Sequence, residues 1–187
     1  MKALFLLAAE LDRFFLERQW RYCFIGGIAN QRWGQPRTTV DVDVTLLTGL
    51  GTEETFVDEL LSNYSARIPD PRSFALQHRV LLLQSSGGIG IDISLGMIAF
   101  EEKTVARASR YEFLPGVSLL TCSAEDLIVL KAFADRGQDW LDVEGVLIRQ
   151  KGLLDWDYIL SELTPLVNLK EAPDILTHLQ QLRRKLP

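Results

Sequence analysis

The sequence predicts a mixed α/β fold followed by a helical segment. Short apolar runs and amphipathic stretches alternate up to about Leu120, and only helical patterns follow from Ser123 onward. With 187 residues, of which 47% are hydrophobic and 24% charged, the chain is long enough to bury a core of ordinary size. We therefore expect an α/β core over residues 1–120 and, packed on it, a helical segment over residues 121–187.

Two helices and two strands are expected at the start of the chain. In "MKALFLLAAELDRFFLERQW", apolar side chains recur near helical spacing and predict an amphipathic helix. The apolar run "YCFIGG" predicts a strand that ends in a tight turn. A short helix around residues 28–33 is expected to end at "GQP", because a residue before proline disfavours helical geometry. The second strand is expected from about Thr38 to Leu47.

The middle of the chain predicts a helix and a β-hairpin. In "GTEETFVDELLSNYSA", Thr52 is the expected N-cap and acidic residues occupy the first turn. The proline-bearing "RIPDPRS" predicts a loop, and "RVLLLQSSGGIGIDISLG" predicts two strands joined by a Ser-Ser-Gly-Gly turn. Residues 97–120 are expected to hold a short helix, a turn and an edge strand.

Four helices are expected after residue 122. The first begins at "SAED", a variant capping box in which Ser123 caps the helix and Asp126 takes the third position. The other three are predicted by the patterns in "DWLDVEGVLIRQKG", "DWDYILSELTPLV" and "APDILTHLQQLRRKLP".

Composition excludes several classes of protein. The formal net charge of −5 and the pI of about 5.1 leave no global basic field to hold nucleic acid, so any nucleic-acid partner would need a local basic patch. Cys23 and Cys122 lack CxxC spacing and partnering histidines, so reduced core thiols in a cytoplasmic protein are expected. The N-terminal apolar run is interrupted by Glu10 and Asp12, and no run reaches the ~18 apolar residues of a membrane span, so no membrane partner is expected.

Two aspartates stand in an otherwise apolar strand. Side chains alternate along a strand, so Val42 and Val44 line one face while Asp41 and Asp43 share the other. Asp is depleted in strands, and neighbouring like charges repel. A divalent cation would turn this repulsion into attraction. Standing alone, such a pair more often belongs to a solvated face of a sheet.

Two further features favour a functional site. Asp92 lies on the second strand of the predicted hairpin, on the face opposite its isoleucines. Gly26 and Gly27 precede a helix, where backbone N–H groups form an anion cradle and the absence of a Cβ lets a phosphate approach. Three carboxylates suit two Mg²⁺ ions, which prefer oxygen ligands and bridge substrate phosphates.

The stretch "GGIANQRWGQPRTTVDVDV" resembles the signature of the polymerase-β-like nucleotidyltransferase superfamily. Its sequence pattern, GxPRxTxDxD, is similar to that of the minimal bacterial branch that includes AbiEii-type toxins. The resemblance implies a mixed twisted sheet flanked by helices, with Asp41 and Asp43 as paired metal ligands, Asp92 as the third carboxylate, and Gly26 and Gly27 as the turn that contacts phosphate.

The resemblance also implies nucleotide-binding roles outside the carboxylates. Arg37 and Thr39 match the positions that precede the aspartates. The segment "EDLIVLKAFADRGQDWLDV" is similar to the C-terminal motif of the branch, which implies that Lys131 contacts the triphosphate while Asp139 and Asp142 close the site. From the residues alone, Lys131 equally fits a solvent-exposed helix position. For Asp139 and Asp142 the residues alone favour a helix N-terminus, where acidic side chains complement the dipole.

The expected function is Mg²⁺-dependent transfer of a nucleoside monophosphate from a nucleoside triphosphate to an acceptor hydroxyl, with Asp92 as the candidate that activates this hydroxyl. The toxin-like signature implies tRNA as acceptor and an antitoxin as partner. A protein hydroxyl or a cationic, aminoglycoside-like small molecule is also open, and the latter would suit the acidic cluster around Asp142. The alternative is a catalytically degenerate, antitoxin-like protein that binds a nucleotide or a partner, against which the three aspartates argue.

Overall fold

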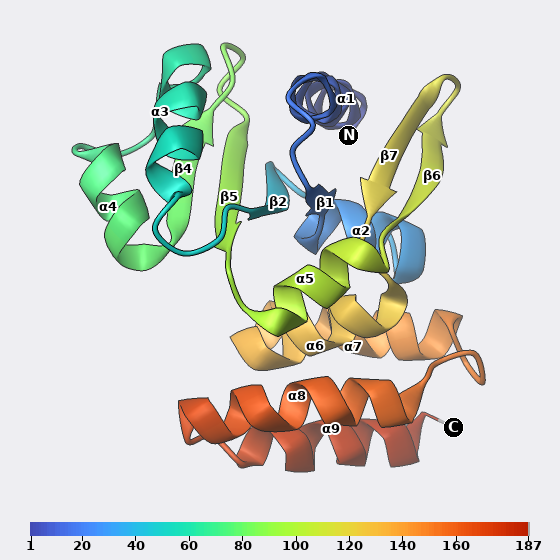
Figure 1. Cartoon of the computed structure of the whole chain (residues 1–187). Coiled ribbons are helices and arrows are strands. Elements are labelled where there is room, and N and C mark those ends of the chain that lie inside the picture. Colours follow the sequence, from blue (N-terminus) through green and yellow to red (C-terminus); the bar gives the residue numbers. More distant parts are fainter. Residues whose placement is uncertain (187) are drawn as a thin grey trace. The chain divides into compact units, whose positions relative to one another are not determined.

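The computed structural model describes residues 1–186 (Figure 1). Contacts within the chain define two units. Residues 1–28 and 38–122 form the sheet unit, whereas residues 29–37 and those from Ser123 onward form the helical unit. The helix α2 (Gly26–Trp33) begins in the first and ends in the second. No helix among residues 1–186 is long and apolar enough to cross a membrane.

The sheet unit is built on a mixed sheet of seven strands in the order β3-β4-β5-β2-β1-β7-β6. Parallel pairing joins β2 to β5 and β1 to β7, and the other pairs are antiparallel. Its elements, in chain order, are α1 (Lys2–Glu17), β1 (Tyr22–Phe24), β2 (Asp41–Leu47), α3 (Glu53–Asn63), β3 (Ser65–Ala66), α4 (Pro71–His78), β4 (Val80–Gln84), β5 (Gly90–Gly96), α5 (Ala99–Ala106), β6 (Ser109–Leu114) and β7 (Val117–Thr121).

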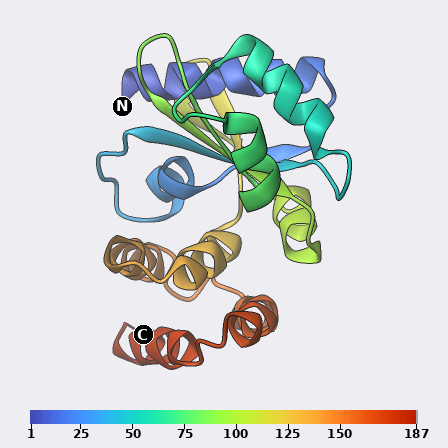
Figure 2. The ribbon, with the colours of Figure 1, turned by 90° about the vertical axis from the view of Figure 1, so that its left-hand side faces the viewer.

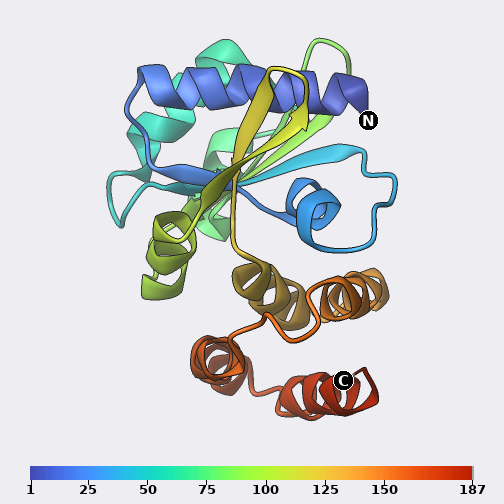
Figure 3. The ribbon, with the colours of Figure 1, turned by 90° about the vertical axis from the view of Figure 1, so that its right-hand side faces the viewer.

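One face of the sheet carries the hydrophobic core of this unit. The helices α1, α3 and α4 bury apolar side chains against the alternate residues Val42 and Val44 of β2 and Ile91 and Ile93 of β5. Figure 2 shows α1 and α3 on the same side of the sheet, where Arg18, directly after α1, pairs with Glu59 of α3. The β6–β7 hairpin lies next to α1 (Figure 3). Because side chains alternate along each strand, the aspartates of β2 and β5 lie on the opposite face.

The structure confirms the predicted hairpin and corrects three local predictions. β4 and β5 pair antiparallel on either side of the Ser-Ser-Gly-Gly turn. The strand expected from Thr38 begins only at Asp41. Thr52 precedes α3, but its hydroxyl donates to the Thr48 carbonyl and makes no capping hydrogen bond.

The third correction is α4, which starts inside the segment expected to be a loop. Pro71 occupies its first turn, where the missing N–H costs nothing, and Asp70 precedes it in a left-handed conformation with φ 46°. The prolines therefore mark the start of a helix here. The segment after residue 97 does contain a helix, a turn and edge-strand pairing, as expected.

The helical unit contains the rest of α2 together with α6 (Ala124–Ala134), α7 (Gly137–Arg149), α8 (Trp156–Lys170) and α9 (Asp174–Lys185). The predicted cap of α6 is confirmed, because the Ser123 hydroxyl accepts the Asp126 backbone N–H at 3.1 Å. α6 is apolar nearly all round and packs against both α7 and α8. It is the central helix of this unit.

Candidate active site

Three carboxylates lie on one face of the sheet unit. In the parallel pairing of β2 and β5, Asp43 is the register partner of Asp92, and Asp41 is the partner of Gly90. Register partners on adjacent strands point to the same face, so the three side chains that the sequence singled out lie together on the face away from the core. The sequence predicted the phase of each strand, and the register shows that the two strands are neighbours.

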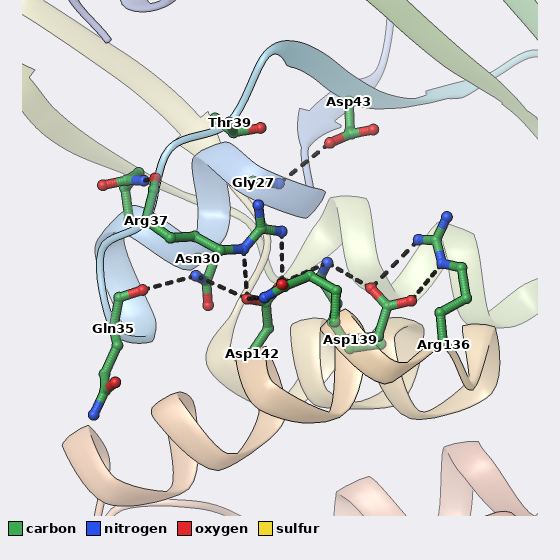
Figure 4. A network of polar contacts seen from close by, with 12 residues as sticks. Gly27, Asn30, Gln35, Arg37, Thr39, Asp43, Arg136, Asp139 and Asp142 are labelled. Carbon is green, nitrogen blue, oxygen red and sulfur yellow. Dashed lines mark hydrogen bonds and ion pairs between the residues drawn. The ribbon is translucent and has the colours of Figure 1, made fainter.

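The glycine turn lies directly against these carboxylates. Gly26 has φ 52°, a left-handed conformation that glycine adopts without strain, and a Cβ at this position would overlap the Asp43 carboxylate. The backbone N–H of Gly27 donates to Asp43 Oδ2 at 3.2 Å (Figure 4). A Cβ at Gly27 would overlap the Thr39 hydroxyl. The glycine pair therefore lets the start of α2 approach both Asp43 and Thr39.

Arg67 is a site residue that the sequence reasoning missed. Its Nη2 donates to Asp92 Oδ1, and its Nη1 lies 3.7 Å from Asp41 Oδ1, so one guanidinium bridges two of the three carboxylates. Arg67 follows β3 in the segment "RIPDP", and its backbone N–H donates to the Leu82 carbonyl at 3.0 Å. No spacing relates it to the aspartates. The strand order alone brings it to them.

The electrostatics of Asp92 show that the carboxylates interact. Burial raises the pKa of the Asp92 carboxyl, the Arg67 guanidinium lowers it, and the negative charges of Asp43 and Asp41 raise it further, with a net shift upwards. A carboxyl group shifted in this direction is a better proton acceptor near neutral pH than an ordinary aspartate.

The donor set has the chemistry that Mg²⁺ prefers, since all three side chains offer carboxylate oxygens. Within residues 1–186, no group of three or more His, Cys, Asp and Glu side chains is gathered closely enough to hold a metal by itself. The guanidinium of Arg67 lies between Asp41 and Asp92, where its positive charge compensates the negative charges of these carboxylates. Asp41, Asp43 and Asp92 thus offer the oxygen atoms that Mg²⁺ prefers and share one face of the sheet, and their role as metal ligands stays a prediction.

A second polar cluster lies in the helical unit (Figure 4). Arg37 donates through Nε and Nη2 to the two oxygens of Asp142, at 2.7 and 2.8 Å. Lys131 Nζ lies 2.7 Å from Asp139 Oδ1 and 2.8 Å from Asp142 Oδ2. Arg136 Nε donates to Asp139 Oδ2 at 2.5 Å. Positive and negative groups therefore alternate through five side chains.

The centre of this cluster is buried. Lys131 is only 7% exposed, so its reading as a solvent-exposed lysine is wrong. Burial alone would raise the pKa of the Asp139 and Asp142 carboxyls. Hydrogen bonds and charge from Arg136 and Lys131 at Asp139, and from Arg37 and Lys131 at Asp142, outweigh burial and lower both pKa values. Both carboxylates are stabilised in their ionised form.

The residues singled out by the sequence thus fall into two groups, each held together within its unit. The sheet unit contains the carboxylates, the glycine turn and the threonine, namely Gly26, Gly27, Thr39, Asp41, Asp43 and Asp92. The helical unit contains Arg37, Lys131, Asp139 and Asp142. Their roles in binding and catalysis stay predictions at this point.

Comparison with solved structures places the fold. A crystal structure of an antigenic nucleotidyltransferase-like protein from Paracoccidioides brasiliensis aligns with 95% of this chain over 92% of its own, at 17% identity and a TM-score of 0.53. A solution structure of the antibiotic-resistance factor ANT(2'')-Ia aligns over 94% of both chains, at 18% identity and a TM-score of 0.51. Neither a protein-family model nor a curated protein sequence matches the chain. The predicted fold class is confirmed: the chain has the fold of nucleotidyltransferase-like proteins, with a mixed sheet flanked by helices.

Proposed function

We propose that the chain is a nucleotidyltransferase that moves a nucleoside monophosphate from a nucleoside triphosphate to an acceptor hydroxyl. The observation that carries the proposal is the pairing of Asp43 with Asp92 on adjacent parallel strands, with the Gly26–Gly27 turn against Asp43. A glycine turn at a helix start offers backbone N–H groups to phosphate, and the neighbouring carboxylates offer oxygen ligands. The shared fold supports this arrangement.

Each residue then has a distinct task. The N–H groups at the start of α2 bind phosphate oxygens, and Arg37 adds a guanidinium contact. Asp41, Asp43 and Asp92 would hold Mg²⁺, which when bound neutralises charge on the phosphates and on the leaving pyrophosphate. Asp92 takes the proton of the acceptor hydroxyl. The bond from the acceptor oxygen to the α-phosphorus forms as the bond from that phosphorus to the bridging oxygen breaks, and pyrophosphate leaves.

The proposed acceptor is tRNA, since the signature that includes the aspartates is similar to that of AbiEii-type toxins. An antitoxin partner belongs to the same proposal. A small-molecule acceptor is the second candidate, because an antibiotic-resistance factor shares the fold over 94% of both chains.

The test uses purified protein with α-labelled or γ-labelled nucleotides, in Mg²⁺ or in EDTA. Total tRNA, the protein itself and an aminoglycoside are offered as separate acceptors. We expect acceptor labelling only from the α-position, only in Mg²⁺, and not with Asp43→Asn. The matched control, Asp157→Asn, alters an exposed aspartate in the first turn of α8 and should label normally. Label transferred only from the γ-position would exclude nucleotidyl transfer. No label from either position would favour the degenerate, antitoxin-like alternative.

A further inference from the structure

One face of α7 binds the segment Trp33–Arg37. Asp142 forms the two hydrogen bonds to the Arg37 side chain, Arg149 Nη1 donates to the Gly34 carbonyl, and Gln150 Nε2, directly after the helix, donates to the Trp33 carbonyl at 3.0 Å. The positions 142, 145 and 149 share one face of a helix, being three and four residues apart. The segment therefore lies along this face for the whole second half of α7.

Gly145 lies where α7 and the segment Trp33–Arg37 are in close contact. A Cβ at this position would lie 2.9 Å from the Gln35 backbone nitrogen, so any larger residue would push the segment away. Glycine inside a helix costs roughly 1 kcal/mol relative to alanine. The contact with Gln35 explains why glycine stands in the middle of α7, because this contact leaves no room for a side chain at position 145.

The opposite side of the segment is also held. Asn30 Nδ2 donates to the Gln35 carbonyl at 3.0 Å, and the Gln31 side chain donates to the Arg37 carbonyl. Both donors belong to α2, whose last residue, Trp33, begins the segment. The segment is thus held between α2 and α7, and the direction of the Arg37 side chain is set by Asp142.

Lys131 does not reach beyond this cluster. Its ammonium group is buried between Asp139 and Asp142, at 2.7 and 2.8 Å from their oxygens. A buried carboxylate needs compensating charge, and Asp142 receives it from Lys131 on one side and Arg37 on the other. Removing Lys131 would therefore leave Asp142 without one of its compensating positive charges.

We propose that Asp142 and Gly145 are positioning residues for Arg37, and that Lys131 acts through Asp142 rather than on the triphosphate itself. The face of α7 fixes the direction of the Arg37 guanidinium and pre-organises it, so that nucleotide binding does not have to order it. This inference rests on the proposed nucleotidyltransferase function, and it adds the residues that set nucleotide affinity.

The kinetic test is a double-mutant cycle with Arg37→Gln, Asp142→Asn and both together. If Asp142 acts only through Arg37, each single variant should raise KM for the nucleotide about tenfold, because one charge-assisted contact is lost. The kcat of each variant should stay within about twofold of the wild-type value. The double variant is then no worse than Arg37→Gln alone. Effects that multiply, or a KM unchanged by Asp142→Asn, would overturn the proposal.

A second pair of variants avoids any change of charge. Gly145→Ala should raise KM in the same way because its Cβ displaces Gln35, whereas Gly137→Ala, in open space at the start of the same helix, should leave KM unchanged. Equal KM values for the two alanine variants would contradict the positioning role of Gly145.

Hydrogen exchange provides a readout that does not depend on catalysis. The backbone amides of Trp33, Gly34, Gln35 and Arg37 should exchange at least about tenfold faster in Asp142→Asn and Gly145→Ala, while amides of α8 and α9 keep the wild-type rate. Unchanged exchange in residues 33–37 would overturn the proposal, and faster exchange everywhere would mean that the variants unfold the unit. If the wild-type protein binds nucleotide in calorimetry but transfers nothing, the proposed function fails. The double-mutant cycle, measured as the nucleotide Kd of each variant in place of KM, then still decides this inference.

Discussion

Asp43 on β2 lies directly opposite Asp92 on the parallel strand β5, and both side chains face away from the hydrophobic core. Asp43, between the core residues Val42 and Val44, therefore contributes nothing to the hydrophobic core. Its neighbours are another carboxylate and the Gly27 backbone N–H, which donates to it at 3.2 Å. This pairing of two carboxylates on adjacent strands is the observation on which the proposed metal and nucleotide site rests.

The first prediction concerns the two aspartates of β2. Asp41→Asn and Asp43→Asn should lower nucleotidyl transfer at least about a hundredfold while leaving the free energy of unfolding in EDTA unchanged or higher, because each removes like-charge repulsion around Asp92. Thermal melts in EDTA beside transfer assays are the measurement. A marked loss of stability in both variants would show that these aspartates are structural.

The second prediction concerns Arg67, which bridges Asp41 and Asp92. Because the guanidinium and Mg²⁺ compete for the same carboxylates, Arg67→Gln should enlarge the rise in Tm that Mg²⁺ produces relative to EDTA. Arg72→Gln is the matched control, since Arg72 pairs with Glu54 and Asp58 instead. A Mg²⁺ shift that is equal in both variants would mean that Arg67 does not occupy the cation position.

The third prediction concerns Gly26, whose left-handed φ of 52° and missing Cβ allow the turn to meet Asp43. Gly26→Ala combines backbone strain with overlap of the carboxylate. Gly116→Ala has the same kind of backbone, at φ 76°, but open space around its Cβ. Both should lose about 1 kcal/mol from strain, and only Gly26→Ala should lose more and lose activity as well. Chemical denaturation and transfer assays measure the difference. Equal losses would show that the contact with Asp43 is unimportant.

The fourth prediction concerns acid stability, because Asp139 and Asp142 have lowered pKa values in the folded protein. The unfolded chain then binds protons before the folded one. Their contribution is fully present above the unfolded pKa of about 3.9 and is lost as pH falls through the lower folded pKa. The free energy of unfolding should therefore drop below about pH 4, with a shallower slope in Asp142→Asn than in wild type. Denaturant titrations from pH 7 to 3 test this. An identical slope would show that Asp142 is not the group that titrates.

The sequence alone determined the features that depend on a few neighbouring residues. The alternation around Asp41 and Asp43 fixed which face each side chain takes, and the capping role of Ser123 followed from its spacing to Asp126. The β4–β5 hairpin was equally local. The start of α4 at Pro71 was missed, because proline both ends segments and begins helices, and the choice depends on the turn before it.

Only the tertiary structure decided which distant groups meet. Periodicity tells which way Asp92 points but not which strand lies beside it, and the register with Asp43 comes from the order of strands in the whole sheet. Likewise, helical spacing did not distinguish an exposed Lys131 from the buried one that pairs with Asp139 and Asp142. Arg67 had no signal at all in the sequence. An ion pair requires only that two charges meet in space, and packing across the chain, not local periodicity, determines that meeting.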